Sequence, residues 1–368
     1  MKQTTADLSA SIPVLPNRPL KAADEADLYG ALSLRRNKAL DFVENAAFDP
    51  GLAVYDTDYQ NNQSLSPKFF DHLNQILGLL KDHYPAGARL VEVGCGKGYF
   101  VELIQAEGSF SIEGFDGAYE GENPAIGKRY LTANDRISAD LVILRHVLEH
   151  IRKPHEFLFL LKEIFGAADI YIEVPDFDWI KENHAFFDIT YEHVNYFSQA
   201  AMASLFSEHG KKGLMFDRQY QFMLANLGKL DFEEFSKSYA KSDNWEAHQF
   251  QDFFPEFRSK IDQISHAADR PNAGLYVWGA ATKGVMFCHH LKALAPDLFA
   301  KIVGAIDINP KKVGRYLPSS KLPVVDPDTF STRATGSEIV LIANPNYEDE
   351  IRASLIDKGL GQIKTINL

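Results

Sequence analysis

The stretch of sequence that decides the fold is Leu90–Phe100, LVEVGCGKGYF. A short apolar run ends at Val93 and passes into three closely spaced glycines, Gly94, Gly96 and Gly98, after which a helical pattern begins. Glycine permits a sharp turn and lets a ligand lie against bare backbone at a helix N-terminus. In open α/β sheets, ligands bind at the carboxyl ends of strands near such a turn. The stretch therefore predicts a strand, a ligand-binding turn and a helix.

The sequence on the C-terminal side continues this alternation of strands and helices. Apolar runs at 89–93, 111–115, 141–144 and 170–174 are separated by helical stretches that follow Gly98 and Pro154. The pattern restarts further along, with apolar runs at 274–278, 302–307 and 338–343. Strand and helix at this spacing indicate a parallel sheet covered by helices on both faces. We therefore predict two α/β domains in one chain.

The sequence on the N-terminal side contains one clear helix. In Ser66–His83, apolar residues recur every three or four positions, and Ser66 with Pro67 forms a typical helix start. The pattern at Ala31–Asn45 also predicts a helix, and Tyr55–Ser66 is polar and predicts a loop. Residues 1–30 contain three prolines and little periodicity, which predicts a loosely held arm.

A helical connector is expected between the two α/β domains. Residues 229–268 predict one or two amphipathic helices, with a stripe that we interpret as packing: Phe232, Phe235, Tyr239, Phe250, Phe254, Phe257 and Ile261. The expected division is an N-terminal arm with helices at 1–80, the first α/β domain at 81–228, the connector at 229–270 and the second α/β domain at 271–368.

Composition excludes several classes of protein. The net charge of −12 over 368 residues argues against nucleic-acid binding. No apolar run is long enough for a membrane helix, and the N-terminus lacks the apolar core of a signal peptide, so we expect a cytoplasmic protein. Two cysteines, Cys95 and Cys288, cannot form a disulfide framework, and we interpret Cys95 as a small turn residue rather than a catalytic thiol.

Two further segments extend the glycine turn into a cofactor pattern. The next strand ends at Phe115-Asp116, where a carboxylate can accept hydrogen bonds from both hydroxyls of a ribose, although a turn cap is the alternative. The stretch 140–150, DLVILRHVLEH, follows. The spacing is G-x-G-x-G rather than the G-x-G-x-x-G of nicotinamide proteins. Taken in order, these segments resemble class I methyltransferases. The resemblance implies a doubly wound sheet and S-adenosylmethionine (SAM) bound by Glu92, Gly94, Gly96, Gly98, Asp116, Arg145 and His146.

A dense cluster of polar residues supplies candidates for catalysis. Glu192 and His193 stand between Tyr191 and Tyr196, so one short segment holds a carboxylate, a base and two phenols. Methyl transfer from a sulfonium requires an aligned nucleophile and, for an acidic nucleophile, removal of its proton. Histidine is the usual base at neutral pH. We predict that His193 is the base, with a loop anchored by aromatic packing as the alternative.

The order of segments resembles the sugar C-methyltransferases that act on nucleotide-linked deoxysugars. The resemblance covers residues 85–368 and includes IEVPDFDWI, FFDITYEHVNYFS and VWGAATKGVMF. It implies that Glu192 and His193, together with a tyrosine, act beside the keto group of a sugar. We further predict Tyr191 as the catalytic phenol and Tyr196 as a substrate contact, and His150 either orients substrate or is structural. Thr190 stands where the family has tyrosine, and Tyr191 stands where it has histidine. The family also opens with a four-cysteine zinc domain, whereas residues 1–80 contain no cysteine, so we expect a reduced, metal-free N-terminal part.

The second α/β domain is expected to be Rossmann-like and to bind the nucleotide of the sugar. Gly279–Gly284 follows a strand and starts a helix, and Asp307 ends the next strand, where an acidic ribose partner would stand. Residues 271–368 carry 11 Lys/Arg against 9 Asp/Glu, a charge of +2 that leaves −14 for residues 1–270. We predict Lys283, Lys311 and Arg315 as ligands of an anionic group. The alternative is a packing domain with a tight glycine turn.

One metal pattern also occurs. His146–His150 spells H-x-x-E-H, which on a helix would place both histidines on one face. Because the methyltransferase resemblance accounts for this segment, we expect no metal there. The leading hypothesis is a SAM-dependent methyltransferase for a sugar, acting on carbon or oxygen. O- or N-methylation of another small metabolite and a non-catalytic SAM-binding protein stay open, as does the oligomeric state.

Overall fold

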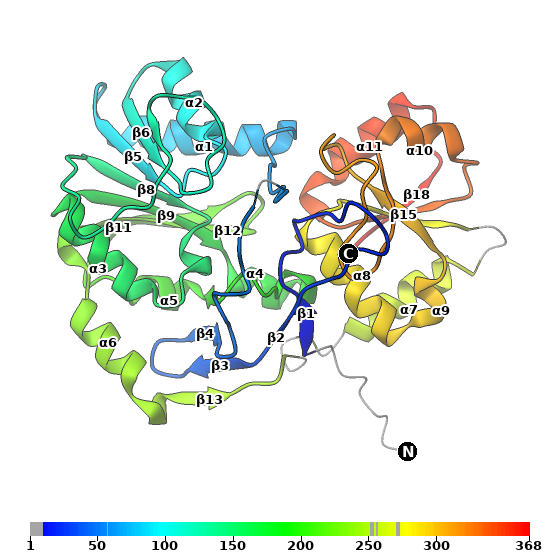
Figure 1. The fold of residues 1–368 in the computed structure, drawn as a ribbon, viewed down its shortest axis with the longest axis horizontal. Coiled ribbons are helices and arrows are strands. Elements are labelled where there is room, and N and C mark those ends of the chain that lie inside the picture. The colour runs from blue at the N-terminus through cyan, green and yellow to red at the C-terminus, as the bar shows by residue number, and fades with distance from the viewer. Residues whose placement is uncertain (1–9, 57, 251–253, 255–256, 270–272) are drawn as a thin grey trace.

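The computed structural model describes residues 10–56, 58–250, 254, 257–269 and 273–368. These residues form two α/β domains that lie side by side, with the N-terminal segment passing between them and over the C-terminal domain (Figure 1). Two α/β domains follow from the two series of strands and helices in the sequence. Among the described helices, none combines the length and the apolar character needed to cross a bilayer.

The first domain is built on a seven-stranded sheet with the order β11-β12-β9-β8-β5-β6-β7. Its strands are β5 (Arg89–Val93), β6 (Ser111–Phe115), β7 (Ile126–Gly127), β8 (Leu141–Arg145), β9 (Asp169–Pro175), β11 (His209–Met215) and β12 (Tyr220–Asn226). Its helices are α1 (Pro67–His83), α2 (Tyr99–Glu107), α3 (Pro154–Phe165), α4 (Phe177–Glu182) and α5 (Gln199–Ala203). Strands β5 to β9 are parallel, whereas β12 runs antiparallel to β9. Strand order reverses at β5, so a ligand crevice is expected at its carboxyl end.

The C-terminal domain is built on a fully parallel five-stranded sheet with the order β16-β15-β14-β17-β18. Its strands are β14 (Leu275–Trp278), β15 (Ile302–Ile306), β16 (Val324–Val325), β17 (Ile339–Ile342) and β18 (Lys364–Asn367). Its helices are α8 (Thr282–Leu294), α9 (Pro296–Phe299), α10 (Pro327–Arg333) and α11 (Glu348–Asp357). Strand order reverses at β14. The fold class predicted from the sequence, two doubly wound α/β domains, is confirmed.

The helix predicted at Ala31–Asn45 is wrong. This segment forms β2 (Tyr29–Ala31), β3 (Leu34–Asn37) and β4 (Phe42–Asn45), and β3 and β4 pair as an antiparallel hairpin. The Asn37 side chain accepts hydrogen bonds from the backbone N–H groups of the turn between them. The hairpin becomes stable because it sits in a four-stranded sheet with the order β10-β4-β3-β13, whose outer strands are β10 (Asn195–Phe197) and β13 (Trp245–Ala247).

The connector at 229–268 is therefore only partly helical. It contains α6 (Phe232–Ala240) and α7 (Phe257–Ala267), but β13 lies between them and pairs with β3. Phe235, Phe250 and Phe254 are buried in apolar clusters, in agreement with the packing interpretation. The side chain of Phe257 and residues 251–253 lie outside the described residues.

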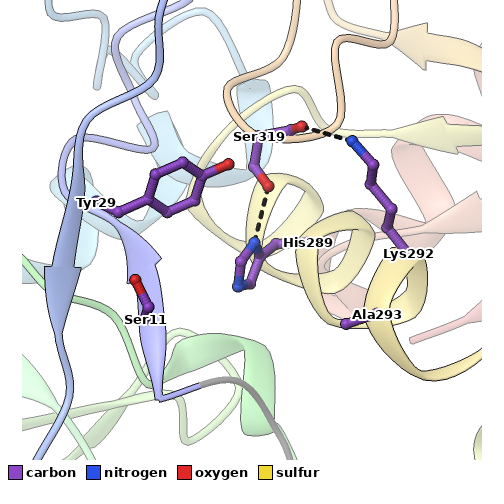
Figure 2. A pocket seen from close by; sticks show the side chains of 6 residues that line it. All are labelled: Ser11, Tyr29, His289, Lys292, Ala293 and Ser319. Carbon is purple, nitrogen blue, oxygen red and sulfur yellow. Dashed lines mark hydrogen bonds between the residues drawn. The ribbon is translucent and has the colours of Figure 1, made fainter.

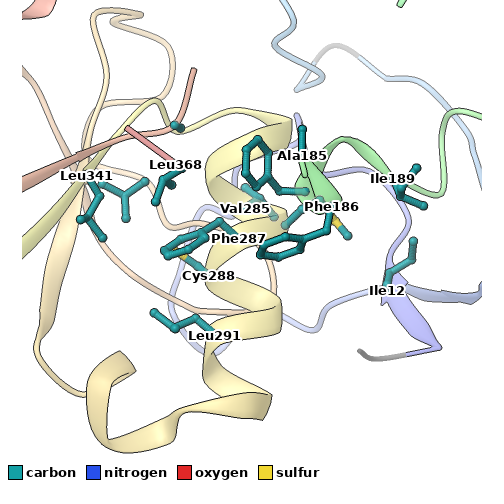
Figure 3. Packing of buried hydrophobic residues seen from close by; sticks show 14 of the residues in the cluster. Ile12, Ala185, Phe186, Ile189, Val285, Phe287, Cys288, Leu291, Leu341 and Leu368 are labelled. Carbon is teal, nitrogen blue, oxygen red and sulfur yellow. The ribbon is translucent and has the colours of Figure 1, made fainter. Parts of the chain in front are cut away.

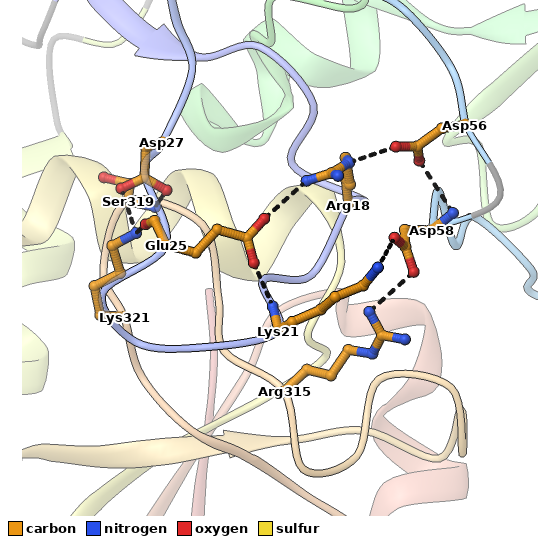
Figure 4. A network of polar contacts seen from close by, with 9 residues as sticks. All are labelled: Arg18, Lys21, Glu25, Asp27, Asp56, Asp58, Arg315, Ser319 and Lys321. Carbon is orange, nitrogen blue, oxygen red and sulfur yellow. Dashed lines mark hydrogen bonds and ion pairs between the residues drawn. The ribbon is translucent and has the colours of Figure 1, made fainter.

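The N-terminal arm is more firmly held than the sequence predicts. Residues 1–9 lie outside the described residues, but β1 (Ser11–Pro13) pairs with β2, and Leu20 exchanges two backbone hydrogen bonds with Tyr316 of the C-terminal domain. A network of ion pairs continues the attachment (Figure 4). In it, the Asp58 carboxylate forms ion pairs with Lys21 Nζ at 2.7 Å and with Arg315 Nη1 at 3.0 Å. Local sequence patterns do not predict these contacts, because residues 315–321 are about 300 positions away in the sequence.

Helix α8 holds the two domains together. Its buried residues Val285, Phe287 and Leu291 lie between the C-terminal sheet, represented by Leu341, and Phe186 of the first domain (Figure 3). The segment that carries Glu192 and His193 thus packs against the C-terminal domain as well as its own sheet. This packing positions the catalytic candidates at the boundary between the domains.

Candidate active site

One cavity of about 640 Å³ is lined by both domains. Gly94, at the end of β5, and Gly279, at the end of β14, both line it. The two points at which strand order reverses therefore open onto the same space. The loop that includes Tyr59 and residues 61–67, before α1, provides a further wall.

The glycine turn leaves bare backbone toward this cavity. Gly94, Gly96 and Gly98 have φ values of +75°, +57° and +83°, a region that side chains rarely adopt. A Cβ at Gly94 would lie 2.4 Å from Val147 Cγ2, whereas a Cβ at Gly96 would meet no atom within 4 Å. Gly98 is the N-cap of α2 and lies outside the cavity lining. The open space over Gly96 fits a ligand that lies directly on the backbone.

Two of the predicted cofactor residues brace the site instead of lining it. Asp116 accepts a hydrogen bond from Gly96 N at 2.8 Å and another from Ala118 N at 2.7 Å, so it acts as the turn cap that the sequence left as the alternative. Glu92 is buried and binds Arg145 through Nε at 2.9 Å. Arg145 and His146 line the cavity, and Glu92 reaches it through its hydrogen bond to Arg145.

The predicted catalytic pair lines the same cavity. Tyr59 donates a hydrogen bond of 2.5 Å to Glu192 Oε2, and His150 Nδ1 lies 2.8 Å from the backbone oxygen of Glu192. Burial raises the pKa of Glu192 to about 8. Burial, reinforced by the neighbouring His150, lowers the pKa of His193 to about 3. At neutral pH the cavity wall therefore presents a neutral imidazole beside a carboxyl group that retains its proton.

Both predicted phenols lie away from the cavity. The Tyr191 hydroxyl accepts a hydrogen bond from Asp49 N at 2.8 Å, and its ring packs on Phe48. The Tyr196 hydroxyl is bonded to both the N and the O of Thr190. Tyr191 and Tyr196 are thus buried, bonded to the backbone, and absent from the cavity lining, so the geometry does not favour the predicted roles of these two residues. Tyr59 places a phenol against Glu192 at the cavity wall, and the sequence signal for it was the polar loop.

A chain of ionisable side chains runs from the cavity wall into the first domain. Glu173 Oε1 lies 3.1 Å from His72 Nε2 and 3.3 Å from His146 Nε2, and His146 Nδ1 lies 3.5 Å from Glu149 Oε1. Burial lowers the pKa of His146, but Glu149 and Glu173 outweigh burial and raise it to about 9. His146 follows β8 with φ +54°, and the 3₁₀ turn comprises Leu148–His150, so the two histidines of H-x-x-E-H do not share a helical face.

The predicted cations of the C-terminal domain occupy different places. Lys283 lines the cavity and forms an ion pair with Asp188. Lys311 is exposed and outside the lining, and Arg315 is engaged by Asp58, so these two predicted ligands are not at the site. Lys312, which the sequence did not single out, lines the cavity with its Nζ 3.6 Å from Asp307 Oδ2.

A second hollow, of about 330 Å³, lies between the N-terminal arm and α8 (Figure 2). There, His289 Nδ1 lies 2.7 Å from Ser319 Oγ, and Lys292 donates to the backbone oxygen of Ser319. None of its lining residues lines the large cavity. It is separate from the cavity around Gly96.

Comparison with known proteins agrees with this geometry. A family model described as a methyltransferase domain matches residues 63–213, and one described as a C-methyltransferase C-terminal domain matches residues 225–362. No curated protein matches the chain.

Among solved structures, the chain is similar to N-methyltransferase NodS from Bradyrhizobium japonicum, with 12% identity, a TM-score of 0.31 and coverage of 44% of this chain and 98% of that one. It is also similar to a SAM-dependent methyltransferase from Aquifex aeolicus, with 12% identity, a TM-score of 0.33 and coverage of 44% and 94%. The plantazolicin methyltransferase BpumL, solved with SAH, has 13% identity, a TM-score of 0.34 and coverage of 45% and 86%.

The two family models meet in one cavity, because the glycine turn belongs to the first and the end of β14 to the second. The chain therefore contains a methyltransferase domain that is followed by a C-methyltransferase C-terminal domain.

Proposed function

We propose that this methyltransferase acts on a sugar, carried by a nucleotide, with His193 as the general base. The observation that carries the proposal is the shared cavity. The bare backbone at Gly96, the pair Glu192–His193 and the end of β14 at Gly279 all line one space. Its volume of about 640 Å³ lies in the range of ligand sites, and it draws walls from both domains.

His193 has the environment of a proton acceptor. The bound SAM would supply an electrophilic methyl group, and the chain must align the acceptor and remove its proton. His193 is neutral at physiological pH because burial lowers its pKa to about 3, so its lone pair is available, but the same burial weakens it as a base. The neighbouring Glu149 carboxylate raises the pKa of His193 and thus favours the imidazolium that would form. Without that carboxylate, His193 would be a weaker base.

Glu192 is suited to hold the acceptor rather than to take its proton. Its Oε2 accepts the Tyr59 hydrogen bond, while its buried Oε1 has no hydrogen-bond partner among the described residues. With a pKa of about 8, the carboxyl group retains its proton at pH 7 and can donate it to a substrate oxygen. A keto or hydroxyl oxygen of a sugar would satisfy this unpartnered group.

The C-terminal wall is suited to the activated end of the substrate. The N-terminal turn of α8, including Thr282 and Lys283, lines the cavity, and helix N-termini favour anions. Lys283 and Lys312 add two cations, each beside a carboxylate. A diphosphate bound at this wall would have to compete with Asp188 and Asp307 for these two lysines. O- or N-methylation of another metabolite requires the same base, and identification of the methylated atom would separate these reactions.

The test is transfer of labelled methyl from SAM to a panel of nucleotide sugars and the corresponding free sugars. We expect transfer to a nucleotide sugar, and we expect His193→Asn to reduce it ~100–10,000-fold while SAM affinity stays unchanged. His209→Asn, at an exposed histidine on β11, serves as the matched control and is expected to keep full activity. SAM binding without transfer to any acceptor of the panel, or full activity of His193→Asn, would contradict the proposal.

A further inference from the structure

Glu149, His150 and His193 come together at one wall of the cavity. Their candidate ligand atoms all lie within 4.8 Å of one another. Glu149 and His150 belong to the 3₁₀ turn after β8, and His193 precedes β10, so the group forms only in the tertiary structure. Two imidazoles and one carboxylate are a donor set that suits divalent transition metals such as zinc, iron and nickel.

Glu149 is a buried carboxylate whose two oxygens accept no hydrogen bond among the described residues and whose nearest cationic partner is shared. Its side chain is 2% exposed. Its charged neighbour is His146 at 3.5 Å, and His146 is shared with Glu173 at 3.3 Å. A buried carboxylate without hydrogen bonds is costly unless it is paired or coordinates a metal. Glu149 also lines the cavity, so a cation can reach it.

His150 is already oriented as a metal ligand. Its Nδ1 lies 2.8 Å from the backbone oxygen of Glu192, which can only accept a hydrogen bond, so Nδ1 carries the proton. The lone pair is therefore on Nε2. Metal-binding histidines commonly donate their other N–H to a backbone carbonyl in this way, which fixes the tautomer and the ring.

The two segments that carry the three side chains are tied together. Asn195, at the start of β10, donates from Nδ2 to the backbone oxygens of Leu148 and Ile151, which flank Glu149 and His150. The rings of His150 and His193 lie 5.0 Å apart at an angle of 75°. A ligand set held by a fixed scaffold needs only small side-chain rotations to close on an ion about 2.1 Å from each donor.

We propose that Glu149, His150 Nε2 and His193 form a binding site for a divalent transition metal ion, with an open coordination position toward the cavity. Three protein ligands and one open position are typical of zinc sites that bind water or substrate. The site is independent of the identity of the methyl acceptor. It has one consequence for the proposed function: the lone pair of His193 serves either the metal or a proton, so a bound ion would stop His193 from acting as base.

The experiment is titration of the metal-free full-length protein with Zn²⁺ by calorimetry, and with Co²⁺ by visible absorption, in the absence of SAM and acceptor. We expect one ion per chain, and at least tenfold weaker binding in Glu149→Gln and in His193→Gln. Retained SAM affinity shows that the variants are folded. Cys95→Ser and His209→Gln are the matched controls, because Cys95 is a potential metal ligand elsewhere in the cavity lining and His209 is an exposed histidine. Both controls should bind the metal as the unaltered chain does.

Absence of Zn²⁺ and Co²⁺ binding, or unchanged binding in Glu149→Gln, would overturn the metal site. Transfer assays then test the proposed base separately. Zn²⁺ should inhibit transfer in the unaltered chain, with recovery on addition of a chelator. Metal binding that depends on Glu149 but leaves transfer unaffected would support the metal site and contradict the assignment of His193 as base.

Discussion

Substitution of Gly96 tests where the cofactor lies. Gly96 has φ +57°, and a Cβ placed on it would meet no protein atom within 4 Å. Alanine in a left-handed conformation costs about 1–2 kcal/mol, so Gly96→Ala should fold with a modest loss of stability. The added methyl group would occupy the cavity at the point where the backbone is bare. We therefore expect SAM affinity to fall at least tenfold, which corresponds to about 1.4 kcal/mol.

Gly87 supplies a control with the same backbone strain. It has φ +82°, a Cβ there would also meet nothing within 4 Å, and it lies outside the cavity. Gly87→Ala should lose about 1–2 kcal/mol of stability and keep its affinity for SAM. Gly94→Ala should lose about 1–3 kcal/mol more than either, because its Cβ would lie 2.4 Å from Val147 Cγ2.

The assays are urea denaturation for stability and calorimetry for SAM binding. Equal SAM affinity in Gly96→Ala and Gly87→Ala would refute the reasoning, since it would mean that the cofactor does not lie on the glycine turn. Equal stability of Gly94→Ala and Gly96→Ala would refute the steric part, because only Gly94 has a neighbouring side chain in the way.

Three further predictions concern the buried groups. Because burial raises the pKa of Glu192 from 4.5 to about 8, its contribution to stability is complete below about pH 4.5 and is lost as the pH rises through 8. Glutamine cannot titrate, so the stability of Glu192→Gln relative to the unaltered chain should increase between pH 5 and pH 9. The increase should be several kcal/mol, at about 1.4 kcal/mol per pKa unit. A difference in urea denaturation that does not change with pH would contradict this. Glu173→Gln leaves His72 and His146 without their buried carboxylate and should cost about 3–5 kcal/mol. The raised pKa of His146, about 9, means that this cost should be larger at pH 6 than at pH 10, which denaturation at both values would check. Phe287→Ala should cost about 3–5 kcal/mol because Phe287 is buried in α8 between the domains, whereas Phe70→Ala, at a side chain 45% exposed, should cost little.

Local signals were sufficient for the α/β elements. Strands at Arg89–Val93 and Ser111–Phe115 were predicted with the bounds that the structure has, because apolar runs and glycine turns act over a few residues. The helix start at Ser66 was likewise predicted, and its side chain accepts a hydrogen bond from Phe69 N. The same reasoning gave the wrong prediction for Ala31–Asn45, because its strands pair with Asn195–Phe197 and Trp245–Ala247, which are far away in the sequence.

The candidate site divides in the same way. Glu192 and His193 were found from the sequence, because an adjacent base and carboxylate form a local signal. Tyr59 was not found, since it reaches Glu192 across 133 residues of sequence. Lys312 and Lys311 differ by one position, yet Lys312 is buried at the cavity and Lys311 is exposed. The turn conformation decides which of the two side chains points inward.

By itself, the sequence determined the parts that depend on neighbours: the glycine turn, the order of strands and helices, and the pair Glu192–His193. The tertiary structure alone decided that the two domains share one cavity, that Tyr191 is bonded to the backbone, and that Glu149 and His150 meet His193. The physical reason is that backbone propensities act within a few residues. A site formed by separate segments depends on long-range packing and pairing, here the apolar contacts of α8 and the hydrogen bonds of Asn195.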